Sequence, residues 1–324
     1  MPGRTQIRCA LLIAAALPLG AQVTVAGDGS GDFRTVQAAV DAAPAAGSAI
    51  RIRAGVYREH LTIGKPHIAL IGLGAKPADV VLMYDLSAGT AGGTTKSAST
   101  TISGSDFLAE NLTFENSFSR NKPLTQEGSQ AVAVKVTGDR AVFRRVRFLG
   151  FQDTLYANGA GARQYFEDCY IEGNVDFIFG NSLAWFEHCE IHALAHSQIM
   201  LTAQSKLTAE EKSGYVFDHC RVTAGPGADR IWLGRPWRAY AAVTFLHTEL
   251  PAQIVPAGWS EWMHDGKPSL PTVSYAEFDS RGPGANPKAR DPHSKQLTAA
   301  EAGRLNPKSF LAGDDGWDPT GVRP

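Results

Sequence analysis

The sequence lacks several features that mark common classes of protein. Its 324 residues carry a formal net charge of −1, whereas nucleic-acid binding usually needs a strongly basic face. The apolar run at residues 10–17 is too short to cross a membrane. The Gly-x-Ser-x-Gly motif of a serine nucleophile elbow is absent, and the nine scattered histidines give no four-ligand zinc spacing. We therefore expect no nucleic-acid partner, no membrane span, and no metal or other cofactor.

The N-terminus carries a pattern typical of exported proteins. Arg4 and Arg8 precede the apolar run, and Pro18-Leu19-Gly20-Ala21 follows it. A basic segment, a short apolar segment and small residues near a cleavage point predict a secretory signal peptide. We assign it to residues 1–21 and the mature chain to residues 22–324, with a buried first helix as the alternative. A secreted protein, extracellular or periplasmic, is expected.

Long helical patterns are nearly absent, and short strand-like segments recur instead. Each begins with phenylalanine, followed three residues later by a small residue, threonine or valine, and five residues later by an apolar residue. Glycine, asparagine, aspartate and proline between the segments favour turns. The phenylalanines are Phe143, Phe166, Phe186, Phe217 and Phe245. Their spacing of 20 to 31 residues, with local alternation of apolar positions, predicts an all-β fold: a parallel β-helix in a single domain.

Three other segments complete the expected fold. Residues 35–43 form a short helix, which we expect to cap the open N-terminal end of the solenoid. Residues 87–101 are rich in Gly, Ser, Thr and Ala and are expected to form an exposed loop. Residues 281–324 are expected to pack back on the solenoid as a tail, with a short helix near residues 298–305.

In such a solenoid, equivalent positions of successive coils form ladders. Cys169, Cys189 and Cys220 each follow a repeat phenylalanine by three residues, so they occupy one ladder. Neighbouring rungs lie about 4.8 Å apart, within the Cα range that a disulfide tolerates. An exported protein can keep a disulfide, and we favour Cys169–Cys189 because the shorter interval leaves less room for an excursion. The alternative is a ladder of buried free thiols.

Two aspartates, Asp153 and Asp176, are separated by 23 residues, an interval that also occurs in the repeat. If this interval is one coil, the two carboxyl groups stack on neighbouring strands roughly 5 Å apart. Like charges at that range push the two pKa values apart, which suits acid–base or nucleophilic chemistry. Gln130 and Gln152 fall on neighbouring rungs and could donate hydrogen bonds to an oxyanion. Arg235 could hold one aspartate ionised.

The sequence closely resembles the pectin methylesterases (pectinesterases), a family of right-handed parallel β-helix carbohydrate esterases. The resemblance covers essentially the whole mature chain. It rests on five motifs in order: Gly55-Val-Tyr-Arg-Glu59, Gln130-Ala-Val-Ala-Val134, Gln152-Asp-Thr-Leu155, Asp176-Phe-Ile-Phe-Gly180 and Leu233-Gly-Arg-Pro-Trp237. Residues 290–293 depart from the family's usual pattern, which leaves the packing of the tail open.

The resemblance implies hydrolysis of galacturonate C6 methyl esters in homogalacturonan. Asp176 would be the nucleophile, and an acyl-enzyme would form. Gln130 and Gln152 would stabilise the oxyanion. Asp153 would act first as general acid and then as general base, and Arg235 would keep Asp176 anionic. Further candidates would line the substrate groove: Trp237, Thr94, Val175, Phe179, Tyr156 and Met263. A monomer is expected.

Two rival functions remain open at this point. A β-helix glycosidase or lyase acting on the same polymer would also use acidic residues. However, a hydrolase does not obviously need two glutamines beside the carboxylates, and a lyase would more often carry a calcium cluster. A non-catalytic carbohydrate-binding protein could share the fold. The complete set of two aspartates, two glutamines and an arginine favours the esterase.

Overall fold

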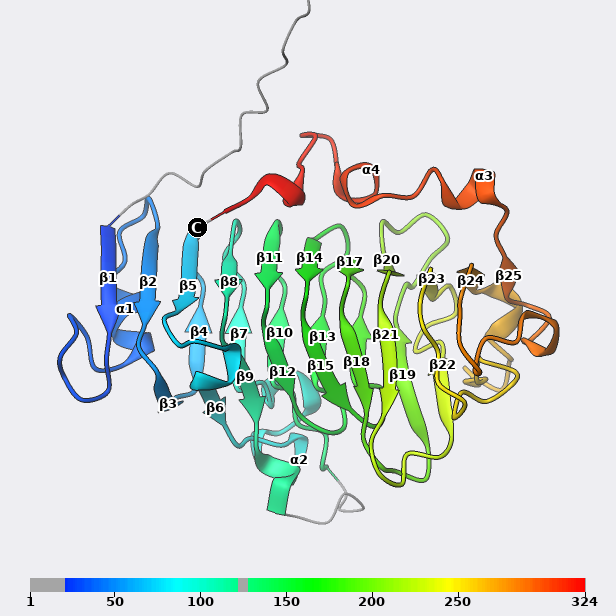
Figure 1. Cartoon of the computed structure of the whole chain (residues 1–324), viewed down its shortest axis with the longest axis horizontal. Coiled ribbons are helices and arrows are strands. Elements are labelled where there is room, and N and C mark those ends of the chain that lie inside the picture. The colour runs from blue at the N-terminus through cyan, green and yellow to red at the C-terminus, as the bar shows by residue number, and fades with distance from the viewer. Residues whose placement is uncertain (1–20, 122–127, 324) are drawn as a thin grey trace, which may run out of the picture.

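The chain winds into a solenoid in which successive coils add parallel strands to three sheets (Figure 1). The structure is a computed structural model that describes residues 21–121 and 128–323. Within these residues the first sheet has 11 strands, and the second and third sheets have 7 strands each. Strands of successive coils pair in parallel in all three sheets. The predicted parallel β-helix is therefore confirmed.

A regular coil contains one strand from each sheet. The first sheet consists of β1 (Ala21–Val25), β2 (Ser48–Ile52), β5 (Ile68–Gly72), β8 (Leu108–Glu110), β11 (Ala141–Arg144), β14 (Arg163–Glu167), β17 (Leu183–Glu187), β20 (Gly214–Asp218), β23 (Ala242–Leu246), β24 (Ser274–Phe278) and β25 (Lys295–Gln296). The second consists of β3 (Gly55–Arg58), β6 (Val80–Tyr84), β9 (Thr113–Asn116), β12 (Arg147–Leu149), β15 (Tyr170–Gly173), β18 (Glu190–Ala193) and β21 (Arg221–Ala224). The third consists of β4 (Leu61–Ile63), β7 (Thr100–Ile102), β10 (Val134–Val136), β13 (Leu155–Ala157), β16 (Ile178–Gly180), β19 (Ile199–Gln204) and β22 (Ile231–Gly234).

The five repeat phenylalanines form a continuous stack inside the solenoid. They occupy paired positions of β11, β14, β17, β20 and β23, and all five side chains are fully buried. Neighbouring ring centres lie 4.8, 4.6, 4.4 and 4.7 Å apart along the stack. Aromatic side chains bury large apolar areas, so this ladder is a principal source of core stability. The repeat read from the sequence therefore marks one strand of each coil.

The three cysteines form the expected ladder but not the expected disulfide. Cys169, Cys189 and Cys220 are buried free thiols, so the predicted Cys169–Cys189 bridge is wrong. Each sulfur instead contacts a backbone carbonyl of the preceding coil, namely that of Phe143, Phe166 or Phe186, at 3.4–3.5 Å. Ladder spacing suits this contact as well as it suits a disulfide, which is why the interval alone could not decide between them.

Each coil makes a sharp corner between the first and second sheets. In seven coils the residue after the first-sheet strand has a φ between 46° and 55°, in the left-handed region. These residues are Asn111, Arg145, Asp168, His188, His219, His247 and Asp279. Few non-glycine residues adopt this conformation readily, and asparagine, aspartate and histidine are the most common among them.

The N-terminal end of the solenoid is covered by α1 (Val36–Ala42), as predicted. The side chain of Thr35 caps this helix by accepting a hydrogen bond from the amide of Ala38. Glu59 also accepts hydrogen bonds, both of 2.9 Å, from the amides of Val36 and Gln37. A carboxylate at a helix N-terminus pairs with unsatisfied amides and with the positive end of the helix dipole. Glu59 is thus a structural residue.

The segment expected to be an exposed loop is largely ordered structure. It holds α2 (Ala88–Ala91), a 3₁₀ turn at Thr94–Lys96 and the start of β7. Ser97 and the two residues after it are buried. Asn116 donates to the carbonyl oxygens of Leu86, Ser97 and Val132, and the hydroxyl of Ser97 accepts from the Val132 amide. These hydrogen bonds satisfy the buried side chains of Asn116 and Ser97, whereas the buried hydroxyl of Ser99 has no partner among the described residues.

The tail returns along the first sheet from the C-terminal end of the solenoid, as Figure 1 shows. It contains α3 (Ala299–Ala302) and α4 (Pro307–Leu311), and α3 lies within the predicted helix. A second hydrophobic core forms between the tail and the outer face of the first sheet. Trp185 and Tyr165 come from the sheet, while Leu311 and Phe310 come from the tail. The tail is therefore an integral layer of the fold.

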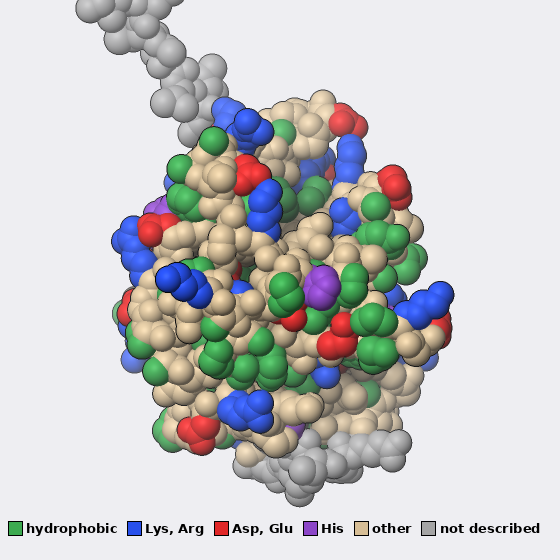
Figure 2. Space-filling view, turned by 90° about the vertical axis from the view of Figure 1, so that its right-hand side faces the viewer, with side chains coloured by type: hydrophobic (Ala, Val, Ile, Leu, Met, Phe, Trp, Pro, Cys, Tyr) green, Lys and Arg blue, Asp and Glu red, His purple; other side chains and the backbone are tan. Residues whose placement is uncertain are grey.

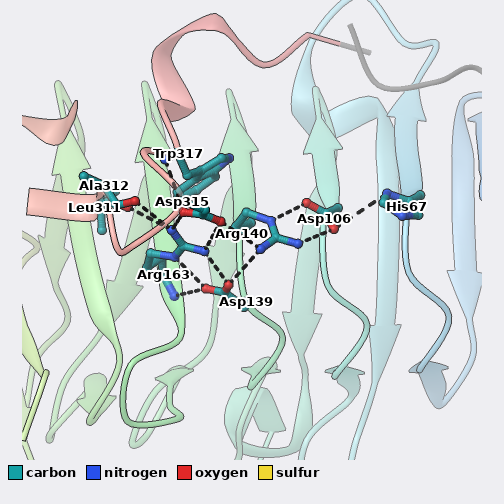
Figure 3. Close-up of polar contacts among 9 residues, drawn as sticks. All are labelled: His67, Asp106, Asp139, Arg140, Arg163, Leu311, Ala312, Asp315 and Trp317. Carbon is teal, nitrogen blue, oxygen red and sulfur yellow. Dashed lines mark hydrogen bonds and ion pairs between the residues drawn. The ribbon is translucent and has the colours of Figure 1, made fainter. Parts of the chain in front are cut away.

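Charged side chains clamp the tail to the first sheet (Figure 3). Arg163, in β14, donates to the carboxylates of Asp139 and Asp315 and to two carbonyl oxygens at the end of α4. Its guanidinium carbon lies 5.4 Å from the ring centre of Trp317. The side chain of Arg163 is 7% exposed, whereas that of Asp315 is 46% exposed. Arg163 is the buried anchor of the clamp.

Arg140 extends the clamp toward the N-terminal end of the solenoid (Figure 3). It binds the carboxylate of Asp106 through two nitrogens, at 2.6 and 2.8 Å. A third nitrogen lies 3.3 Å from Asp139 and 3.2 Å from Asp315, so both arginines share the same two carboxylates. Such a network holds its members in place better than an isolated surface pair does.

Arg163→Ala should loosen the tail, because it removes the donor to Asp139, Asp315 and the end of α4. The expected result is faster tryptic cleavage of the folded protein after Arg304 or Lys308, followed by mass spectrometry. Lys212→Ala is the matched control, since Lys212 and its partner Asp314 are 70% and 98% exposed. It should leave the rate unchanged, and an unchanged rate in Arg163→Ala would show that the clamp does not hold the tail.

The surface of the described residues carries both signs of charge. Figure 2 shows the end of the solenoid beyond β24 and β25, where hydrophobic, acidic and basic side chains are interspersed. No described helix combines the length and apolar character needed to cross a membrane.

Candidate active site

The third sheet brings Asp153 and Asp176 to equivalent positions on adjacent coils. Leu155 in β13 pairs with Ile178 in β16, and each aspartate precedes its strand residue by two positions. The 23-residue interval is therefore one coil. Both aspartates have positive φ, 64° and 52°. Such strained conformations are often found at functional sites, and aspartate tolerates them better than most residues.

A cavity of about 420 Å³ opens over these two residues. Eight of the predicted site residues share it, although they come from several different coils of the solenoid. The lining residues are Thr94, Thr95, Gln130, Gln152, Asp153, Asp176, Phe179, Ala203, Arg235, Trp237 and Trp262.

Asp176 and Arg235 form a two-point ion pair in this cavity. Nε of Arg235 lies 2.8 Å from Oδ1 of Asp176, and Nη2 lies 2.7 Å from Oδ2. The side chains are 8% and 21% exposed, so the pair is largely shielded from water. The guanidinium carbon of Arg235 lies 4.2 Å from the ring centre of Trp262, so the indole ring packs against the guanidinium group. Both oxygens of Asp176 are thus aligned by a rigid partner.

The two carboxyl groups differ in their electrostatic surroundings. Burial raises the pKa of Asp153 well above its usual value, and the charge of Asp176 raises it further, against the opposing effect of Arg235. Burial also raises the pKa of Asp176, but the hydrogen bonds and charge of Arg235 oppose that rise directly. The arginine contacts Asp176 and not Asp153, so Asp153 is the carboxyl group that holds a proton more readily.

Two amide side chains stand beside the carboxyl pair. Gln130 precedes β10, and Gln152 is adjacent to Asp153. The backbone amide of Ala131, next to Gln130, donates a hydrogen bond of 3.1 Å to the backbone carbonyl of Gln152. This bond holds the two segments together on neighbouring coils. Among residues 21–121 and 128–323, neither glutamine side chain hydrogen-bonds to another group. Both amides are therefore available as donors to a ligand.

Aromatic side chains form one wall of the cavity. Phe179 stacks on Tyr156 with ring centres 4.3 Å apart and planes 2° apart. Trp237 meets Phe179 edge-on at 5.9 Å. An indole or phenyl face is a suitable platform for the apolar face of a sugar ring.

Three sequence candidates lie outside the lining, and three lining residues were not foreseen. Val175 is buried and is not a lining residue. Met263 is 54% exposed and also lies outside the lining. The same holds for Tyr156, which stacks on the lining residue Phe179. The unforeseen residues are Thr95, Ala203 and Trp262. Of these, Ala203 could have been found from the register, since it pairs with Phe179.

The arrangement suits acyl transfer. An aligned carboxylate can act as a nucleophile, and a neighbouring carboxyl group with a raised pKa can deliver a proton. Two free amide donors can stabilise an oxyanion that forms between them.

Comparisons with known proteins agree on one family. A sequence model described as Pectinesterase matches residues 22–314. Pectinesterase 31 of Arabidopsis thaliana is 39% identical over 305 residues, which are 89% of this chain and 92% of the relative. A solved pectin methylesterase from carrot has a TM-score of 0.83 at 34% identity, over 91% of this chain and 94% of its own. Pectin methylesterase PemA from Erwinia chrysanthemi has a TM-score of 0.80 at 32% identity, over 93% and 98%.

Proposed function

Because this chain belongs to the pectinesterase family and is a carboxylic ester hydrolase, we propose that it hydrolyses the C6 methyl esters of galacturonate units in homogalacturonan. The products are methanol and de-esterified pectin. The observation that carries this proposal is the pairing of two unlike carboxyl groups in one cavity. Asp176 is aligned by Arg235, whereas Asp153 lacks that partner and holds a proton more readily.

In the first step, a carboxylate oxygen of Asp176 attacks the C6 carbonyl carbon. The carbonyl oxygen becomes an oxyanion, which accepts hydrogen bonds from the amides of Gln130 and Gln152. The intermediate collapses by breaking the bond between C6 and the methoxy oxygen. Asp153 gives its proton to that oxygen, and methanol leaves. An anhydride now joins C6 to Asp176.

In the second step, Asp153 has become a carboxylate and takes a proton from water. The water oxygen attacks C6 and breaks the anhydride, which returns Asp176 as a carboxylate beside Arg235. Asp153 ends the cycle protonated, and the galacturonate carries a free carboxyl group. Ester and water are thus converted to acid and methanol, and both aspartates recover their starting states.

Substrate contacts follow from the aromatic wall. Trp237 and Phe179 offer ring faces to a galacturonate unit, and Thr94 also lines the cavity. We propose these three as substrate-binding residues and leave out Val175, which does not line the cavity.

We further propose that residues 1–21 are a secretory signal peptide and that residues 22–324 are the catalytic domain, exported as a monomer. The basic and apolar segments of residues 1–17 support the signal peptide. Residues 1–20 lie outside the described part of the chain, and β1 begins at Ala21.

The direct test is the release of methanol from highly methyl-esterified pectin by the purified protein. Each methanol should be matched by one new carboxyl group, measured as base uptake. Growth of reducing ends or of unsaturated ends without methanol would mean that the protein is a glycosidase or a lyase.

Gln130→Ala and Gln152→Ala should each lower kcat by about 10²- to 10³-fold, the usual cost of removing one oxyanion donor. KM should change much less, because the contact strengthens only as the oxyanion forms. Gln198→Ala, at an exposed position away from the cavity, should behave as wild type. A change in KM alone would assign the glutamines to ground-state binding.

Asp153→Asn should lower activity by about 10²- to 10⁴-fold and also stabilise the protein at neutral pH. The folded-state pKa of Asp153 is raised above its ordinary value of 3.8. Ionisation therefore penalises the folded state as pH rises from 3.8 through the raised pKa, and asparagine removes that penalty. The Tm of the variant should exceed that of wild type at pH 7, and the gap should close below pH 3.8. A lower Tm at pH 7 would argue against a raised pKa.

A further inference from the structure

A cluster of histidines and carboxylates lies at the corner between the first and second sheets. Three consecutive coils carry a histidine at the left-handed corner position: His188, His219 and His247, with φ of 51°, 50° and 46°. Their rings form a ladder, with centres 5.3 Å apart between the first two and 4.6 Å apart between the last two. None of them contributes to the catalytic cavity, which lies over the third sheet.

Asp218 lies between two of these histidines. Its Oδ1 is 2.9 Å from Nδ1 of His219 and 2.8 Å from Nδ1 of His247. The three ligand atoms of this group all lie within 4.8 Å of one another. Two imidazole nitrogens and a carboxylate oxygen therefore converge on one point, and no described arginine or lysine forms an ion pair with Asp218.

The three side chains are held by a rigid backbone. The amide of His219 donates to the carbonyl of Leu246 at 3.1 Å, and that of His247 donates to Phe278 at 2.8 Å. The ring of Phe278 also packs edge-on against His247 at 5.4 Å. A site whose ligands are already positioned loses less entropy when it binds an ion.

The donor set identifies the class of ligand. Imidazole nitrogen with one carboxylate oxygen suits zinc and the neighbouring transition metals better than magnesium or calcium, which prefer oxygen ligands. Bonds of about 2.0–2.2 Å in a tetrahedron place neighbouring ligand atoms roughly 3.3 Å apart. A small rotation of the two rings away from Asp218 would give that spacing. Neutral imidazole can carry its proton on Nε2, which leaves Nδ1 of each histidine free to bind an ion. The two side chains are 50% and 29% exposed, so an ion can reach them from solvent.

We propose that Asp218, His219 and His247 form a surface site for one divalent transition-metal ion of the zinc type, with water in the remaining position. Asp218 ends β20, His219 follows it, and His247 follows β23. The ion ties the β20 coil to the β23 coil, next to the point where the second sheet ends at β21 and only the first sheet continues. The site stabilises the C-terminal end of the solenoid and has no part in ester hydrolysis.

The test is binding of Zn²⁺ to purified, tag-free protein by titration calorimetry, together with the visible spectrum of bound Co²⁺. One ion should bind per chain, and Co²⁺ should give the intense bands of a four-coordinate site. At a metal concentration ten times Kd, Tm should rise by a few degrees. His219→Asn and His247→Asn should each weaken binding at least tenfold, and asparagine keeps the left-handed corner intact.

His293→Asn is the matched control, because His293 also lies 2.9 Å from an aspartate, Asp291, but has no second histidine beside it. That variant should bind as wild type does. No saturable binding at millimolar Zn²⁺, or equal affinity in wild type and both corner variants, would overturn the proposal. Asp218→Asn preserves the shape of the side chain and removes its charge, so its Zn²⁺ affinity gives a third test of the site. This variant leaves the corner residues His219 and His247 unchanged. Methanol release should be the same with and without Zn²⁺ bound.

Discussion

Asp176→Asn is expected to lower kcat for methanol release by about 10⁴-fold or more, the scale seen when a nucleophile is removed from a covalent mechanism. Asparagine tolerates the φ of 52° and can still accept a hydrogen bond from Arg235, so the fold should survive. It cannot form the anhydride, because an amide oxygen is a poor nucleophile at carbon. The measurement is methanol release at saturating substrate, with circular dichroism to confirm folding.

Asp85→Asn is the control for this experiment. Asp85 also pairs with an arginine, Arg58 at 2.6 Å, but the two side chains are 43% and 54% exposed and lie outside the catalytic cavity. Activity should be unchanged in that variant. If Asp176→Asn kept activity within tenfold of wild type, Asp176 could not be the nucleophile, and direct attack by water would replace the anhydride.

Arg290→Ala is expected to destabilise the protein by about 3–5 kcal/mol, the cost of leaving a buried charge without its partner. Arg290 lies 2.6 Å from Glu277, with the two side chains 2% and 3% exposed. It also donates to the carbonyl oxygens of Pro256 and Gly284, so one guanidinium joins β24 to two loops. The free energy of unfolding, from urea titration, measures the effect.

A second arginine provides the comparison. Arg281 lies 2.6 Å from Asp279, as close as Arg290 lies to Glu277, but its pair is 70% and 45% exposed. Arg281→Ala should change the free energy of unfolding by less than about 0.5 kcal/mol, because exposed pairs contribute little. Equal effects of the two substitutions would mean that burial does not control the strength of these pairs. Arg290 is a buried anchor of the tail.

The sequence predicted the parts of the fold that depend on local periodicity. The phenylalanine spacing located one strand in each of five coils, and the 23-residue interval placed Asp153 and Asp176 on adjacent coils. Both succeed because a solenoid converts chain separation into spatial register. The glutamines and Arg235 followed from the same logic together with the family motifs.

The sequence could not show contacts made by the segments between strands, because these segments vary in length. Trp262 reaches the cavity from a loop that follows β23, and no repeat fixes where that loop returns. His219 and His247 meet only because their coils stack, and their separation in the chain matches no metal motif. The cysteine ladder was foreseen, but its spacing fits a thiol facing a carbonyl as well as a disulfide.

The most direct test of the account is mass spectrometry of one defined substrate, a fully methyl-esterified hexamer of galacturonate, during incubation with the protein. The account predicts a series of products that each differ from the previous one by a single CH₂ unit, at constant chain length. It also predicts that Asp176→Asn leaves the hexamer intact. Shorter oligomers, or products that carry an unsaturated sugar, would contradict ester hydrolysis as the reaction of this site.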